Sequence, residues 1–145
     1  MRRKLRMGVV GLGMGAWHAQ GYQEDGRAEV VALCDVDGAR LAAAGKEYGV
    51  SELYTDAGKM FRKAGLDAVS IATPNKFHAP LTIAAFRQGL HVLCEKPMAM
   101  TVREAERMLD ASKKARRNLM INFSYRFSDM SYALKQQVEA GVVGD

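Results

Sequence analysis

The sequence contains few of the residues that cross-link or interrupt a polypeptide. Only two of its 145 residues are cysteine and only three are proline, which excludes a small disulfide scaffold and a proline-rich extended chain. Two cysteines also fall short of the four ligands of a structural zinc site, so we expect no bound metal. No apolar run approaches the roughly 18–20 residues that span a membrane. The remaining composition, with 48% hydrophobic and 26% charged residues, is typical of a globular domain with its own core.

Acidic residues are fewer than basic ones. Lysine and arginine number 21 against 16 aspartates and glutamates, which gives a formal net charge of +5. The excess lies in residues 2–6 and 113–117, and neither cluster has the aromatic side chains or recognition helix that usually accompany a nucleic-acid surface. The basic N-terminus lacks the apolar segment and cleavage site of a secretory signal. We therefore expect no nucleic-acid partner, no membrane association and a cytoplasmic location.

Short apolar runs alternate with amphipathic stretches along the chain. The runs, which read as strands buried on both faces, occupy residues 7–10, 30–34, 68–72, 91–94 and 119–123, with a weaker one near 53–54. Helical spacing and end signals predict helices over roughly 37–49, 57–65, 79–88, 101–115 and 132–140. This alternation predicts an α/β fold, a doubly wound and mainly parallel sheet with helices on both faces.

A few residues refine this expectation. Asp37 is a candidate N-cap, and Thr101 with Glu104 has the spacing of a capping box. In the strand order of a Rossmann sheet, Cys34 and Cys94 would lie three sheet spacings apart, about 14 Å. A disulfide cannot bridge that separation, because its Cα atoms lie within about 7 Å of each other. Both cysteines are therefore predicted to be free thiols.

A glycine-rich loop follows the first predicted strand and opens a helix. Its sequence, Gly11-Leu12-Gly13-Met14-Gly15-Ala16, matches G-x-G-x-x-G/A with alanine in the third place. In that pattern the first glycine permits a tight turn, the second lets backbone approach a pyrophosphate, and the small third residue lets helix and strand pack closely. Unpaired amides at a helix N-terminus favour an anion. We therefore expect a pyrophosphate to bind at Gly11, Leu12, Gly13, Met14 and Gly15.

Asp35 ends the second predicted strand, 24 positions after Gly11. A carboxylate at about this spacing accepts hydrogen bonds from the adenosine ribose of a dinucleotide and repels a 2′-phosphate, which favours NAD over NADP. Two alternatives remain open at this point. Asp35 could simply cap the following turn, and the glycines with this acid also suit a methyltransferase that uses S-adenosylmethionine.

Two further motifs follow the fourth and fifth strands, where open α/β sheets bind their ligands. They are Thr73-Pro74-Asn75-Lys76-Phe77-His78 and Glu95-Lys96-Pro97, and Asn122-Phe123-Ser124-Tyr125-Arg126 comes later. Together with the glycine loop and Asp35, in this order and at these separations, they resemble the N-terminal half of the Gfo/Idh/MocA family of oxidoreductases. The resemblance implies a dinucleotide-binding Rossmann domain over residues 1–123. Residues 124–145 would connect it to a second, substrate-binding domain that is absent here.

The resemblance also implies roles for individual residues. Thr73 and Asn75 would line the cofactor groove, and His78 would lie near the nicotinamide half. Glu95 and Lys96 would meet the nicotinamide ribose, with Lys96 reaching the substrate hydroxyl as the catalytic residue. A lysine beside a cationic ring has its charged form disfavoured, so it can polarise a carbonyl or relay a proton.

Three residues remain with smaller expectations. Arg126 matches the family's arginine at the entrance to the second domain. His18 matches a family position in the first helix, but a packed or capping role is the ordinary one for such a histidine. Trp17 is expected to pack the same helix.

The activity implied by the resemblance is hydride transfer between NAD(H) and a sugar, polyol or related alcohol or carbonyl compound. The family's second domain brings an aspartate and a histidine and much of the oligomer interface, so the intact protein is expected to be a homo-oligomer and these 145 residues alone to be inactive. A stand-alone nucleotide-binding or redox-sensing module and an NAD-dependent glycosidase of the same family stay open as alternatives.

Overall fold

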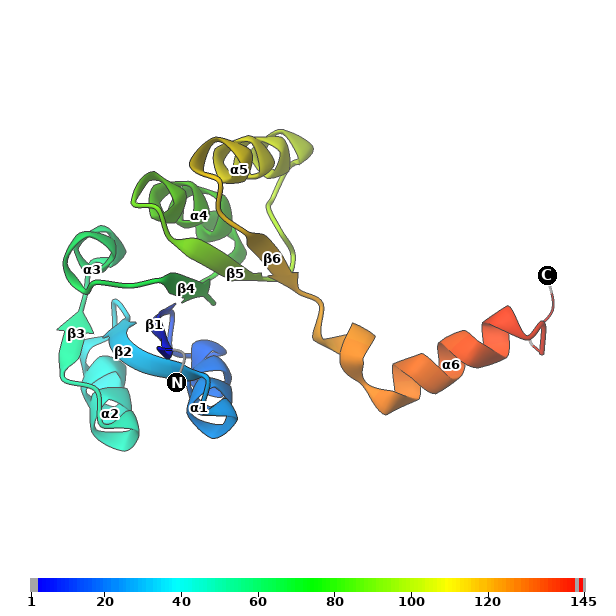
Figure 1. The fold of residues 1–145 in the computed structure, drawn as a ribbon, viewed down its shortest axis with the longest axis horizontal. Helices are drawn as coiled ribbons and strands as arrows, with labels where there is room; N and C mark the ends of the chain where they lie inside the picture. Colours follow the sequence, from blue (N-terminus) through cyan, green and yellow to red (C-terminus); the bar gives the residue numbers. More distant parts are fainter. Residues whose placement is uncertain (1–2, 143, 145) are drawn as a thin grey trace.

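The computed structural model describes residues 3–142 and 144, and its centre is a six-stranded parallel sheet (Figure 1). The strands are β1 (Leu5–Val10), β2 (Ala28–Cys34), β3 (Glu52–Tyr54), β4 (Ala68–Ile71), β5 (His91–Glu95) and β6 (Leu119–Asn122). They follow the order β3-β2-β1-β4-β5-β6, and every neighbouring pair is parallel. This is the strand order of a Rossmann sheet, with the change of direction between β1 and β4. The predicted fold class is confirmed.

Helices cover both faces of the sheet. The covering helices are α1 (Gly15–Asp25), α2 (Gly38–Tyr48), α3 (Ala57–Lys63), α4 (His78–Arg87) and α5 (Val102–Ala115). The chain also forms α6 (Asp129–Glu139) and the short 3₁₀ helices η1 (Asn75–Phe77) and η2 (Ser124–Phe127). Figure 1 shows α1 and α2 on one face and α3, α4 and α5 on the other. One buried cluster, which includes Val9, Leu33 and Leu41, lies under α1 and α2, and another, which includes Ile71 and Met108, lies under the opposite helices.

The local signals in the sequence position the helices as expected. The Asp37 carboxylate accepts hydrogen bonds from the amides of Ala39 and Arg40 at the start of α2, and Thr101 forms the predicted capping box with Glu104 at the start of α5. These caps satisfy backbone donors that a helix leaves unpaired at its N-terminus.

The two cysteines lie on β2 and β5, separated in the sheet by β1 and β4. Both thiols are buried and free, as predicted. Burial raises the pKa of Cys34 to about 12 and that of Cys94 to about 11, so both remain protonated at neutral pH and behave as apolar core groups.

The segment after β6 differs from the rest of the chain. Helices η2 and α6 contain no buried residue, and Figure 1 shows them leading away from the sheet. Helix α6 begins at Asp129, earlier than predicted, because the Ser128 hydroxyl accepts a hydrogen bond from the Ser131 amide and caps it. In the described part of the chain, no helix has the length and apolar character needed to cross a membrane.

Candidate dinucleotide-binding site

The carboxyl ends of five strands bring most of the predicted site residues to one edge of the sheet. The glycine loop follows β1, Asp35 follows β2, Thr73 comes shortly after β4, and Glu95 ends β5. Asn122, at the end of β6, lies in register with Glu95. In open α/β sheets this is the edge at which ligands bind, beside the point where the strand order reverses.

A side chain would meet different surroundings at each of the three loop glycines. Gly11 has φ +85°, and a Cβ added there would lie 2.6 Å from the Ala72 carbonyl oxygen, so only glycine fits the turn. At Gly13 an added Cβ would meet nothing within 4 Å, which leaves this face of the loop open. At Gly15 it would lie 2.7 Å from Val9 Cγ1. Close helix–strand packing therefore depends on Gly15, one position earlier than the pattern suggested.

Three of the five expected loop amides are already used inside the protein. The Gly11 amide donates to the Cys34 carbonyl at 2.8 Å, the Leu12 amide to Asp35 Oδ2 at 2.7 Å, and the Gly15 amide to the Gly11 carbonyl at 3.2 Å. The amides of Gly13 and Met14 make no hydrogen bond to any other residue that the structure describes, and both residues are exposed immediately before α1. These two amides at a helix N-terminus fit a pyrophosphate.

Asp35 holds the loop and the next turn together. Its side chain is only 4% exposed; Oδ2 accepts from the Leu12 amide and Oδ1 from the Asp37 amide at 2.9 Å. Arg40 Nη1 lies 3.3 Å from Oδ2, and the Arg40 side chain is 51% exposed. A carboxylate has about four acceptor positions, so the capping role and the expected bond to a ribose are compatible.

The loop after β4 places its three predicted residues in different surroundings. Asn75 is exposed at the start of η1. Thr73 Oγ1 is buried and has no hydrogen-bond partner among the described residues. His78 is only 1% exposed, and its ring nitrogens lie 2.8 Å from the Thr73 carbonyl and 2.7 Å from the Pro97 carbonyl. His78 therefore ties the loop after β4 to the loop after β5, beneath the surface that a ligand would contact.

Glu95 is the centre of a buried polar cluster. Its Oε1 accepts from Asn122 Nδ2 at 2.7 Å and lies 2.9 Å from His18 Nε2, while Oε2 accepts from the Lys96 amide at 3.1 Å. Burial raises the pKa of Glu95, but these hydrogen bonds outweigh burial and hold its pKa below the usual range. The group at this position is a carboxylate at neutral pH.

Lys96 is exposed and has a hollow of about 460 Å³ beside it. The hollow is lined by Lys96, Pro97, Phe123, Ser124, Tyr125 and Arg126. The structure thus brings together two cations that the sequence singled out separately, the catalytic candidate Lys96 and Arg126. Two nearby cations with exposed aromatic rings form a surface suited to a polar ligand with acceptor oxygens.

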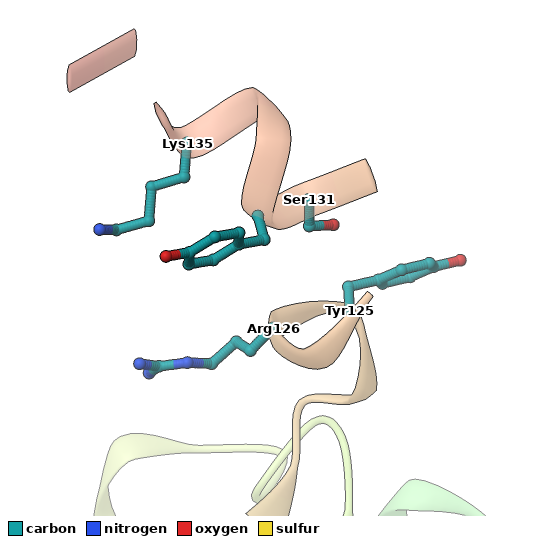
Figure 2. Close-up of a pocket in the computed structure, with 5 residues that line it drawn as sticks. Tyr125, Arg126, Ser131 and Lys135 are labelled. Carbon is teal, nitrogen blue, oxygen red and sulfur yellow. The ribbon is translucent and has the colours of Figure 1, made fainter. Parts of the chain in front are cut away.

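A larger hollow of about 630 Å³ lies between η2 and α6 and is lined by Tyr125, Arg126, Ser131, Tyr132 and Lys135. Figure 2 shows the Arg126 and Lys135 side chains extending toward the same side, with Tyr125 turned the other way. Neither the glycine loop nor a strand end lines it. The smaller hollow, at Lys96, is therefore the one that adjoins the strand ends.

Two residues of α1, His18 and Trp17, lie in surroundings that the sequence did not predict. His18 reaches Glu95 across the sheet edge, and no local signal marks this contact because 77 positions separate the two residues. Trp17 was expected to pack, but it is 71% exposed. The buried positions of α1 are Gly15 and Ala19, and a residue midway between them in sequence points away from their face.

Comparison with known proteins gives the family. A family model described as "Oxidoreductase family, NAD-binding Rossmann fold", the Gfo/Idh/MocA family, matches residues 5–123. The chain belongs to this family. The predicted resemblance and the predicted NAD-binding Rossmann fold are confirmed, and the methyltransferase alternative is excluded.

Curated relatives and solved structures agree with this assignment. The chain is 36% identical over 143 residues to D-glucoside 3-dehydrogenase of Escherichia coli K12, covering 97% of this chain and 41% of that protein. It is 33% identical to myo-inositol 2-dehydrogenase of Thermotoga maritima, covering 97% and 42%. A crystal structure of scyllo-inositol dehydrogenase from Lactobacillus casei with bound NAD(H) and scyllo-inositol superposes with a TM-score of 0.89 at 32% identity, covering 99% and 43%. The chain thus spans less than half the length of each.

Proposed function

We propose that this chain is the NAD(H)-binding part of an oxidoreductase that transfers hydride between nicotinamide and a sugar or polyol. The observation that carries the proposal is the presence, at one sheet edge, of the Gly13 and Met14 amides, which have no partner among the described residues, together with the Glu95 carboxylate and Lys96. The relatives support the substrate class, since they are named as dehydrogenases of glucosides and inositols.

Each group has a distinct part in this proposal. The Gly13 and Met14 amides bind the pyrophosphate, and Asp35 accepts from the adenosine ribose. Glu95 accepts from the second ribose through Oε2, whose only partner among the described residues is the Lys96 amide. The bound cofactor supplies or accepts the hydride at its nicotinamide ring.

Lys96 is the catalytic residue in this proposal. In the oxidation direction the neutral Lys96 amine accepts the proton of the substrate hydroxyl as hydride leaves the carbon; in the reduction direction the ammonium donates that proton to the carbonyl oxygen as hydride arrives. Among the described residues, the hollow beside it is lined by Lys96 and Pro97, which follow β5, and by residues 123–126. We infer that these 145 residues alone bind the cofactor without turning over substrate.

Calorimetric titration of the chain with NADH and NADPH tests the proposal. We expect NADH to bind and NADPH to bind more weakly, because the Asp35 carboxylate repels a 2′-phosphate. Lys96→Ala should change NADH affinity less than about threefold, yet lower turnover at least about 100-fold in the protein that carries both halves. Absence of NADH binding, or undiminished turnover in Lys96→Ala, would contradict the proposal.

A further inference from the structure

The His18–Glu95 contact belongs to a longer chain of polar side chains, drawn from α1, β4, β5 and β6. His18 Nδ1 lies 3.1 Å from the Ser70 hydroxyl, and that hydroxyl lies 2.6 Å from the hydroxyl of Tyr22. The side chains of His18 and Glu95 are 8% and 9% exposed, and Ser70 is buried. Four elements that are far apart in the sequence therefore meet in one closed polar cluster.

The chemistry of the partners gives the hydrogen bonds a direction. A carboxylate only accepts, so His18 Nε2 donates to Glu95 Oε1. Asn122 Nδ2 donates to the same oxygen, and its 3.4 Å separation from His18 Nε2 is that of two donors converging on one acceptor. The Ser70 hydroxyl can donate a hydrogen bond to Nδ1 or accept one from it, and the Tyr22 hydroxyl can likewise donate to Ser70 or accept from it. The cluster therefore stays fully hydrogen-bonded whether the His18 ring is neutral or protonated.

Stability alone is a weak reason for a polar cluster at this place in the core. Buried ionic and polar groups can often be replaced by apolar side chains of similar volume without loss of stability, and neighbouring core positions such as Val9 and Ile71 are apolar. The cluster lies instead at the carboxyl ends of the strands. Two donors occupy Glu95 Oε1, which fixes the rotation of the carboxylate and leaves an acceptor position on Oε2.

We propose that His18 and Asn122 are positioning residues for the nicotinamide half of the cofactor. They hold the Glu95 carboxylate so that Oε2 faces the hydroxyls of the second ribose, and Ser70 with Tyr22 holds the His18 ring in place. This inference rests on the proposed function, which assigns Glu95 to that ribose. Loss of this positioning should weaken binding of the nicotinamide half alone, whereas a general loss of structure would weaken binding of the whole ligand.

The test uses two ligands that differ in that half. NADH contains the second ribose, whereas ADP retains the adenosine and the diphosphate but lacks it. In the 145-residue chain, His18→Leu and Asn122→Leu should each weaken NADH binding about tenfold and leave ADP affinity within about twofold. His18→Gln, whose amide can still donate to Glu95, should recover most of the NADH affinity. Gln20→Leu is the matched control and should change neither affinity, because Gln20 is exposed on α1 and, in the described part of the chain, its side-chain amide bonds only to Glu24.

The outcomes separate the two proposals. Unchanged NADH affinity in both leucine variants, or an equal loss of NADH and ADP binding in variants that melt like the wild type, would overturn the positioning role alone. A wild-type chain that binds NADH no more tightly than ADP would also overturn it, because the nicotinamide riboside would then add no affinity. A wild-type chain that binds neither ligand would overturn the proposed function and this inference together. Variants on two different elements, α1 and β6, keep the test decisive if one of them melts at a lower temperature.

Discussion

The two ends of the candidate cofactor edge are built in opposite ways. At the β1 end the groups offered to a ligand are backbone amides of Gly13 and Met14, positioned by glycine conformations and one carboxylate. At the β5 end the group offered is the Glu95 side chain, positioned by other side chains. A backbone site is defined by what the main chain can adopt, whereas a side-chain site depends on every partner being present.

The difference also appears in the electrostatics. The loop presents the positive end of the α1 dipole, which suits phosphate charge without any basic side chain. The β5 end presents a carboxylate whose pKa is held low by neighbouring donors. The edge is therefore suited to an anion beside the glycine loop and to hydroxyl groups beside Glu95.

The largest effect we expect comes from adding one methyl group at either of two loop positions. Gly11→Ala forces a left-handed residue to carry a Cβ 2.6 Å from the Ala72 carbonyl oxygen, so we expect a loss of at least about 2 kcal/mol in unfolding free energy. Gly13→Ala meets no atom within 4 Å and should melt within about 1 °C of the wild type. It should nevertheless lose NADH affinity about 10- to 100-fold, because the methyl keeps the phosphates from the amides.

Thermal melts and NADH titrations of both variants measure this prediction. Equal stability losses at the two positions would show that the loop is held by general packing and not by the Gly11 conformation. Full NADH affinity in Gly13→Ala would contradict the contrast between the two ends, because the β1 end would then not bind the phosphates through its backbone amides.

An intermediate effect is expected at the β5 end, as a dependence of stability on pH. The folded-state pKa of Glu95 is lowered, so its ionised form stabilises the fold at pH values above its usual pKa of about 4.3, and this contribution is lost as the pH falls through the lowered pKa. Glu95→Gln lacks the contribution. Its Tm should lie a few degrees below that of the wild type at pH 7, and the difference should shrink as the pH falls from about 5 toward 3.

Differential scanning calorimetry across that pH range checks the Glu95 prediction. Glu24→Gln, a change to an exposed carboxylate on α1, is the matched control and should shift Tm little at any pH. A Tm difference for Glu95→Gln that is the same at pH 3 and pH 7 would show that the hydrogen bonds to Glu95 do not depend on its charge.

Much of the fold could be predicted from the sequence because its signals are local. The Asp37 cap and the Thr101–Glu104 box act within three positions, and the apolar runs report the burial of β1, β2, β4 and β5 directly. The start of α6 was missed because Ser128, a good N-cap, stands in a polar and aromatic stretch that reads as a loop. Helix α6 has no buried face to reveal it.

The candidate site was predicted unevenly for the same reason. The glycine loop and the Glu95-Lys96 pair are contiguous motifs, so their residue types show in the sequence. His18 and Asn122 reach Glu95 only after the sheet has formed, from 77 and 27 positions away. Likewise, no spacing rule could show that the His78 ring would lie buried between two backbone carbonyls.

The smallest effect is expected at Arg40, whose side chain lies beside Asp35 at the glycine-loop end of the edge. Arg40 Nη1 lies 3.3 Å from Asp35 Oδ2, so its guanidinium offsets part of the charge that repels a 2′-phosphate. Arg40→Ala should therefore lower NADPH affinity relative to NADH affinity. Exposed pairs contribute about 0.2–1 kcal/mol, which corresponds to a change of about one and a half- to fivefold in the ratio of the two affinities.

Parallel titrations with NADH and NADPH at low and high salt measure the ratio. The effect should fade in about 1 M salt, where screening acts over about 3 Å. Arg27→Ala, which removes another exposed arginine paired with an aspartate, Asp25, is the control, because Arg27 precedes β2 at the opposite end of the sheet from the glycine loop. An unchanged ratio in Arg40→Ala would mean that cofactor choice at this end is made by Asp35 and the backbone alone, which would sharpen the contrast with the side-chain cluster around Glu95.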